Sequence, residues 1–451
     1  MILSATGAFS LLVAALTPMH GIGGRQDLPL PFELVLAGAA TAVIASFLVL
    51  SLVWRTARPA DSGRSLGEAV TRIIDSPGLR WTVRGVGLTV ALFMGMALLF
   101  GQDLLINPIF GFVYVWVWVG LVPISLLFGP VWRTLNPFRT VHLLACRLLR
   151  AKPDHGIARL PDWVGRWPAA IGLFAFVWLE LVAPDRVTIP ILLFWLTLYV
   201  VIMLFGSVLF GQRWFGAADP FEAYALTMAK MSPWARDSSS QIVLRSPLAN
   251  LATFRPQAGM VVFIAVLIGS TGYDGFSNSS LWVGSTQNSI IPTVSVSTLG
   301  LLGFIAVVLG SYTAACLAAG RLTDTSGAEL PGLFLHSLVP IALGYVTAHY
   351  LTLLILEGQR VFITSSDPLS RGWDLFGTAE SGINASIVSY PGLIGSIQTA
   401  AIVVGHILGV ILAHDRALAL FPRRAALIGQ IPLLLVMVGY TVGALLLLFS
   451  E

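Results

Sequence analysis

The chain has 451 residues, of which 56% are hydrophobic and 11% are charged, and its mean hydropathy is +0.84. Such a composition excludes an ordinary soluble domain, in which about a quarter of the residues are charged. The net charge of +4 does not indicate nucleic-acid binding, because the basic residues are spread over loops without an aromatic and basic recognition motif. The alternating pattern of a membrane barrel is also absent. We therefore expect an all-α integral membrane protein.

Apolar stretches recur along the whole chain, with the length of about 20 residues that a helix needs to cross about 30 Å of hydrocarbon. They lie near residues 2–17, 31–54, 85–101, 108–128, 168–184, 188–210, 257–272, 291–317, 332–356, 390–412 and 425–449. Backbone groups in lipid must be hydrogen-bonded internally, so each stretch is a predicted helix. The fold would be a bundle of about 11 transmembrane helices, or 10 if the first is a cleaved signal.

The basic residues predict how this bundle is oriented. With the amino terminus inside, the cytoplasmic loops hold 22 Lys and Arg residues, and the outer loops hold four, namely Arg25, Arg186, Arg360 and Arg371. Positive residues accumulate on the cytoplasmic side of membrane proteins. We therefore predict a multi-pass protein of the bacterial plasma membrane, with a cytoplasmic amino terminus and a carboxyl terminus outside.

The first apolar stretch, residues 2–17, has two interpretations. Its apolar core is typical of a signal segment, but it has no basic region before it and no A-x-A site before His20. We predict that it is retained as a span, and cleavage before His20 is the alternative.

The middle of the chain contains an internal duplication that covers about residues 80–150 and 166–235. In each copy a proline precedes a Phe-Gly pair by 20 residues, a tryptophan follows that glycine by three residues, and Asn-Pro-Phe or Asp-Pro-Phe comes next. Each copy reads as two spans followed by a short cytoplasmic helix at the inner leaflet, which begins at Pro137 or Pro220. Both copies run in the same direction, so the sequence predicts parallel repeats.

The chain divides into four predicted regions. They are a signal-like first span with an outer segment (1–30), a second span with a basic loop (31–84), the two repeats with their cytoplasmic loops (85–256) and a five-span bundle (257–451). The last region has two polar and aromatic outer loops, residues 273–290 and 357–389. Loops of this kind are lids over a site or plain connectors.

Ionisable residues in and beside the spans give the strongest lead to function, because a charged side chain at the bilayer centre costs at least about 2.5 kcal/mol. One group projects to the outer side and consists of His20, Glu33, Glu180, His349 and Glu357. A second group lies at an inner depth and consists of His336, His406 and His414. Histidine and carboxylate together are ligands typical of zinc, copper, manganese and iron.

From these groups we predict metal ligands and catalytic carboxylates. The candidate metal ligands are His349, His20, His406, His336 and His414, and the candidate catalytic residues are Glu180 and Glu357. Glu357 lies about 12 Å along the same helix from His349, at about 1.5 Å per residue. We expect His349 to face the bundle interior with Glu180 or Glu357 within hydrogen-bond or metal-ligand reach. The alternative for each histidine is a hydrogen bond to a neighbouring helix.

Several motifs resemble those of a family of bacterial multi-pass membrane proteins that commonly carry the label fenitrothion hydrolase. They are HGIGGRQDLPLPFELVLAG from His20, HSLVPIALGYVTAHY from His336 with Glu357-Gly358-Gln359, DPLSRGWDLFG from Asp367, and GHILGVILAHDRAL from Gly405. The resemblance implies an organophosphate ester hydrolase. It also implies that cleavage before His20 frees an amino-terminal histidine, which chelates copper through its amine and imidazole. Met19 and Thr17 depart from the small residues expected at such a cleavage site.

Three functions fit these observations. The first is a membrane protein that binds or transfers a transition metal, copper or zinc, near the outer face. The second is a membrane-embedded hydrolase, in which a metal-bound hydroxide attacks an apolar phosphoester. The third is a non-catalytic subunit of a membrane complex. The expected partners are the lipid bilayer and, for the third function, another membrane protein; nucleic acid is not expected.

Overall fold

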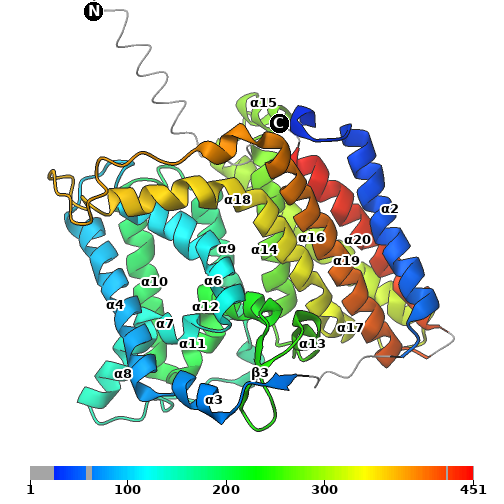
Figure 1. Cartoon of the computed structure of the whole chain (residues 1–451), viewed down its shortest axis with the longest axis horizontal. Coiled ribbons are helices and arrows are strands. Elements are labelled where there is room, and N and C mark those ends of the chain that lie inside the picture. The colour runs from blue at the N-terminus through cyan, green and yellow to red at the C-terminus, as the bar shows by residue number, and fades with distance from the viewer. Residues whose placement is uncertain (1–24, 57–62, 423–424, 450–451) are drawn as a thin grey trace, which may run out of the picture.

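A computed structural model describes residues 25–56, 63–422 and 425–449. The predicted first span and His20 lie outside these described residues. Within them, ten helices are long and apolar enough to cross a membrane, which confirms the all-α membrane fold. Figure 1 shows these helices side by side, with the loop that follows α18 at the upper end and α3, α8 and a small sheet at the lower end. We use upper and lower in this sense below.

The helices that cross the bundle agree with the predicted spans. They are α2 (Phe32–Val53), α4 (Pro77–Phe100), α5–η2–α6 (Pro108–Gly111, Phe112–Gly120 and Leu121–Phe128), α9 (Trp167–Leu181), α10 (Ile189–Phe210), α14 (Met260–Ser277), α16 (Thr293–Leu322), α17–η5–α18 (Leu330–Phe334, Leu335–Ser337 and Leu338–Thr364), α19 (Pro391–Leu420) and α20 (Ala426–Leu448). Several helices are longer than predicted, and two of them extend at their predicted outer ends. Helix α14 continues to Ser277 and α18 continues to Thr364, into segments predicted as outer loops.

The remaining elements are short and lie between the spans. They are η1 (Arg25–Asp27), β1 (Arg64–Ser65), α3 (Glu68–Ile74), α7 (Trp132–Leu135), α8 (Pro137–Leu148), η3 (Asp162–Val164), α11 (Arg213–Ala218), α12 (Pro220–Met228), η4 (Ala229–Met231), β2 (Trp234–Arg236), β3 (Ile242–Leu244), α13 (Pro247–Ala252), α15 (Ser280–Gln287) and η6 (Ser386–Ser389). The strands form one antiparallel sheet in the order β1-β3-β2 at the lower end.

The two copies of the duplication fold into the same order of elements. Each has two spans, a short helix (α7 or α11) and a further helix that begins at the predicted proline, Pro137 or Pro220. The second span of each copy ends at a glycine with positive φ, Gly129 at 69° and Gly211 at 67°. A side chain at these positions would be strained. The helix starts predicted from the Asn-Pro-Phe and Asp-Pro-Phe motifs are therefore confirmed.

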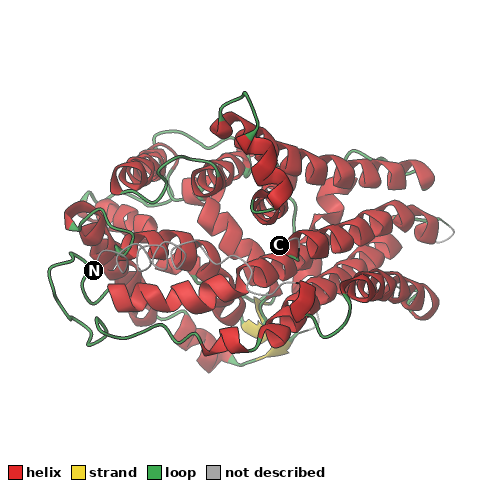
Figure 2. Ribbon diagram, turned by 90° about the horizontal axis from the view of Figure 1, so that it is seen from above, coloured by secondary structure: helices red, strands yellow, loops and turns green. Residues whose placement is uncertain are grey.

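Close packing of α18 on α19 arranges the other half of the molecule. Gly344 and Gly405 lie where the two helices cross, and a Cβ on either residue would be too close to a backbone carbonyl of the other helix. Small residues at such crossings let transmembrane helices approach closely. Helix α14 packs between α18, α16 and α9, so it connects this half to the second repeat. Figure 2 shows the helices from above, with the small sheet at one side.

Candidate functional site

The most polar point inside the bundle is a hydrogen-bonded group of three side chains. His349 Nε2 lies 2.9 Å from Asp274 Oδ2, and the Tyr350 hydroxyl donates to the same oxygen at 2.8 Å. All three side chains are buried, with exposed fractions of 1–3%. A carboxylate removed from water in this way is stable only when charged or hydrogen-bonding groups surround it.

Helix packing brings these residues together. His349 and Tyr350 are neighbours on α18, and Asp274 lies in the last turn of α14, which packs against α18. The residue after Asp274, Gly275, lies beside the imidazole, and a Cβ on it would be in ordinary contact with His349 Cε1 at 3.6 Å. The rings of His349 and Tyr350 meet edge to face, with centroids 4.7 Å apart.

A second carboxylate, Glu180, lies near this group. It occupies the last turn of α9, its side chain is buried, and no described residue hydrogen-bonds its Oε2 atom. Its charge acts on Asp274 and on Tyr350. Burial, followed by the charge of Glu180, raises the pKa of Tyr224. We call Asp274, His349, Tyr350 and Glu180 the central cluster.

The central cluster contains two carboxylates and one imidazole. If both carboxylates are ionised, a protonated His349 offsets one of them. Arg186, after the end of α9, is a basic residue that acts on Glu180, and its effect is smaller than that of Asp274. Two like charges in a low-dielectric interior are unfavourable, so each carboxylate favours positive charge near the other.

The other residues predicted for the outer group lie elsewhere. Glu357 pairs with Arg360, one turn along the same helix, at 2.7 Å, and is partly exposed. Glu33 is exposed on α2. His349 thus faces the interior as predicted, but the carboxylate that it contacts is Asp274 rather than Glu180 or Glu357.

The three histidines predicted for the inner group make hydrogen bonds with backbone and amide oxygens. His336 bonds with the carbonyls of Leu333 and Leu412. His406 Nδ1 lies 2.8 Å from Ile402 O of its own helix. His414 uses both ring nitrogens, Nδ1 with Gln430 at 2.8 Å and Nε2 with the carbonyl of Trp54 at 3.1 Å. Within the described residues no three His, Cys, Asp or Glu side chains form a group poised to hold a metal ion.

Asp274 and Tyr350 are the residues of the central cluster that the sequence analysis does not identify. The predicted span ended at residue 272, so Asp274 was assigned to a polar outer loop. Gly272, Tyr273 and Gly275 lower the hydropathy around Asp274, but they do not end the helix, which continues to Ser277. One further turn of helix brings Asp274 to the depth of His349.

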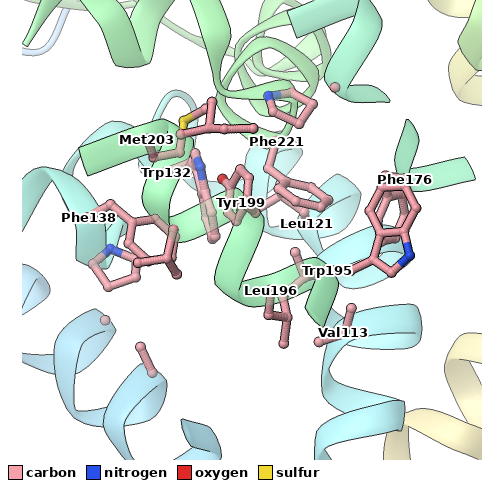
Figure 3. Close-up of a pocket in the computed structure, with 18 of the residues that line it drawn as sticks. Val113, Leu121, Trp132, Phe138, Phe176, Trp195, Leu196, Tyr199, Met203 and Phe221 are labelled. Atoms are coloured by element: carbon pink, nitrogen blue, oxygen red, sulfur yellow. The ribbon is translucent and has the colours of Figure 1, made fainter. Parts of the chain in front are cut away.

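A large apolar cavity lies between the two repeats and next to the central cluster. Its volume is about 1420 Å³, and its walls come from α4, η2, α9, α10 and neighbouring segments. Figure 3 shows Phe176, Trp195, Tyr199 and Phe221 around it. Phe176 lines the cavity and packs on Trp118, whose ring is 6.4 Å from that of Tyr350. Two aromatic side chains, Phe176 and Trp118, therefore connect the cavity to Tyr350 of the central cluster.

The lining of this cavity favours an apolar occupant. The cavity is partly open rather than enclosed, and the side chains around it are almost all apolar. Water fills polar cavities rather than apolar ones, because each buried molecule needs about two to four polar partners. We therefore expect apolar groups, rather than water, in this space.

The lower end of the two repeats is joined by a polar network between equivalent residues. Asn136 donates to Asp219 Oδ2 at 2.7 Å, and Arg139 binds Glu222 through two hydrogen bonds of 2.6 and 2.8 Å. Each pair joins residues 83 positions apart, which is the offset between the Asn-Pro-Phe and Asp-Pro-Phe motifs. Burial and the neighbouring Glu222 raise the pKa of Asp219 to about 6. The two copies therefore meet through the same positions of their motifs.

Comparisons with known proteins do not add a family to these observations. No protein-family model matches the chain, and no curated protein or solved structure is significantly similar to it. The function must therefore be argued from the central cluster and the cavity.

Proposed function

We propose that the protein binds and handles a transition metal ion, zinc or copper, within the membrane near its predicted outer face. The ligands would be His349, Asp274 and Glu180. The observation that carries this proposal is the contact of 2.9 Å between His349 Nε2 and Asp274 Oδ2, inside the bundle and close to a second buried carboxylate.

The chemistry of these donors supports a metal ion. Zinc binds imidazole nitrogen and carboxylate oxygen at about 2.0–2.2 Å, so two donors of one tetrahedral ion lie roughly 3.4 Å apart. The donor atoms of His349 and Asp274 lie 2.9 Å apart in a hydrogen bond, which an ion between them would replace after a small separation of the two side chains. Glu180, whose charge interacts with that of Asp274, would have to move toward the ion to serve as a third ligand. The hydroxyl of Tyr350, which bonds Asp274, would hold that carboxylate in place as an outer partner.

A divalent ion would also offset the two carboxylates of the cluster. With His349 neutral, two carboxylates and one divalent cation sum to zero charge. A proton on Glu180 is the competing way to lower the charge. A bound metal ion and a proton on Glu180 are distinguished by one measurable quantity, the metal content of the purified protein.

The test is elemental analysis of the protein purified from membranes, as isolated and after loading with zinc or copper and desalting. We expect about one ion per chain, lost in His349→Gln and Asp274→Asn and bound at least tenfold more weakly in Glu180→Gln. His349→Gln keeps a side chain that can hydrogen-bond Asp274, so loss of metal would not reflect a lost helix contact. Glu33→Gln and Glu357→Gln are matched controls and should keep the ion.

Two results would overturn the proposal. One is a folded wild-type protein that binds neither metal after loading. The other is an ion that remains in His349→Gln at wild-type affinity. The same preparations also test the hydrolase implied by the sequence resemblance. Turnover of an apolar phosphotriester that is lost on chelation would assign a metal-bound hydroxide to this site.

A further inference from the structure

We propose that the cavity between the two repeats is the binding site of an anionic phospholipid. Its acyl chains would fill the cavity, and its headgroup would lie at the lower end beside Arg159. The proposal is independent of metal binding at the central cluster.

The cavity has the shape of a slot for long apolar chains. Phe362 and Phe376 line its upper end, and Trp132 and Trp163 line its lower end. It therefore extends over most of the height of the two repeats. Sites for drug-sized ligands have volumes of about 300–1,000 Å³, so a volume of about 1420 Å³ indicates a larger occupant. The side chains labelled in Figure 3 are aromatic or aliphatic apart from the hydroxyl of Tyr199.

Charge at the lower end indicates where the headgroup lies. Arg159 is the only charged residue among the described residues that line the cavity, and it is exposed. Trp163 and Trp214 line the same end. Indole rings are common at the level of lipid headgroups, and exposed arginine attracts anionic lipid at a membrane surface.

The surface around this end has the composition of a membrane interface. One segment there has four strongly exposed apolar side chains, Leu148, Leu149, Ile157 and Trp163. The same segment has four exposed basic side chains, Arg147, Arg150, Lys152 and Arg159, and also contains Asp154 and Asp162. Exposed apolar residues next to basic ones are typical of segments that lie on an anionic bilayer. Phospholipid is the amphipathic molecule that is most abundant in a bilayer.

A phospholipid accounts for both features of the site. A small apolar molecule would fill only part of the volume and would leave Arg159 without a role. A neutral lipid would fill the volume but would not form an ion pair with Arg159. An anionic phospholipid has two long chains for the slot and a phosphate for the guanidinium group.

The experiment uses native mass spectrometry of the full chain, exchanged into vesicles of equal phosphatidylglycerol and phosphatidylcholine and then released in mild detergent. Gly95 lines the cavity, and a Cβ on it would meet no atom within 4 Å, so Gly95→Trp should place an indole in the slot. Gly85 lies on the same helix with equal space around it but does not line the cavity. Gly85→Trp is therefore the matched control.

We expect wild type and Gly85→Trp to retain at least one phosphatidylglycerol per chain. Gly95→Trp should retain at least fivefold less phosphatidylglycerol. Arg159→Gln should retain lipid but lose the preference for phosphatidylglycerol, whereas Arg72→Gln, an exposed arginine on α3, should keep it. If Gly95→Trp does not fold, Ala91→Phe tests the same wall. Equal retention in the filled and control variants, or an unchanged preference in Arg159→Gln, would refute the proposal. Retention of a different apolar molecule in place of phospholipid would also refute it.

Discussion

The buried pair Arg139–Glu222 should be essential for the stability of the two repeats. The Glu222 side chain is fully buried and that of Arg139 is 8% exposed. Removing one partner of a buried ion pair leaves the other charge uncompensated and costs about 3–5 kcal/mol. We expect this loss in Glu222→Gln and in Arg139→Met, although Arg133 also lies 3.3 Å from Glu222. Replacing both partners with apolar residues should cost much less than the sum of the single losses.

The assay is reversible unfolding of the purified protein in mixed micelles, with the free energy of unfolding compared between variants. The pair Arg360–Glu357 is the internal control, because its side chains are 36% and 28% exposed. An exposed pair contributes only about 0–1 kcal/mol, so Glu357→Gln should be nearly neutral. The reasoning fails if Glu222→Gln and Glu357→Gln destabilise equally, or if the double replacement at 139 and 222 is additive.

Two further predictions concern the lower end of the bundle. Reporter fusions at residues 155 and 230 should report the cytoplasm, because the basic residues are concentrated on this side; an outer signal at either site would reverse the orientation. The stability of the wild type relative to Asp219→Asn should fall as the pH rises from about 4 to 7. The pKa of Asp219 is raised to about 6 in the folded protein, so its favourable contribution is complete below the ordinary value of about 3.9 and is lost as the pH passes through 6. Unfolding measurements at pH 4, 5, 6 and 7 check this, and a flat or rising difference would contradict it.

The sequence predicts most of the fold because lipid removes the alternatives. A chain that must satisfy every backbone group inside hydrocarbon forms helices wherever about 20 apolar residues follow one another. The duplication can be recognised in the sequence because its motifs determine local structure. Asn136 and Asp219 each cap the helix that starts at the following proline, and a cap followed by proline is a strong start signal.

The site was harder to predict, because it depends on which helices touch. The depth of His349 in its span identifies it, but Asp274 belongs to a different helix, α14, which packs on α18. The pattern of residues within one helix does not reveal which residue of another helix lies beside it. The end of α14 was also misjudged, since two glycines and a tyrosine near Asp274 lower the hydropathy there. Buried glycine in this helix reflects close helix packing rather than a loop, because a Cβ on Gly269 would lie 2.7 Å from the Cα atom of Ile305.

The arrangement of the two repeats links the cavity to the central cluster. The polar network joins the copies at their lower ends, and the cavity separates their spans above it. Glu180 and Phe176 are one turn apart on α9, so the same helix faces the cluster with one residue and the cavity with the other. A change in the occupant of the cavity would therefore act first on Phe176 and Trp118, and through the ring of Tyr350 on the carboxylate of Asp274. If both proposals hold and these rings move, lipid binding and metal affinity would be coupled, and by linkage the coupling would be reciprocal.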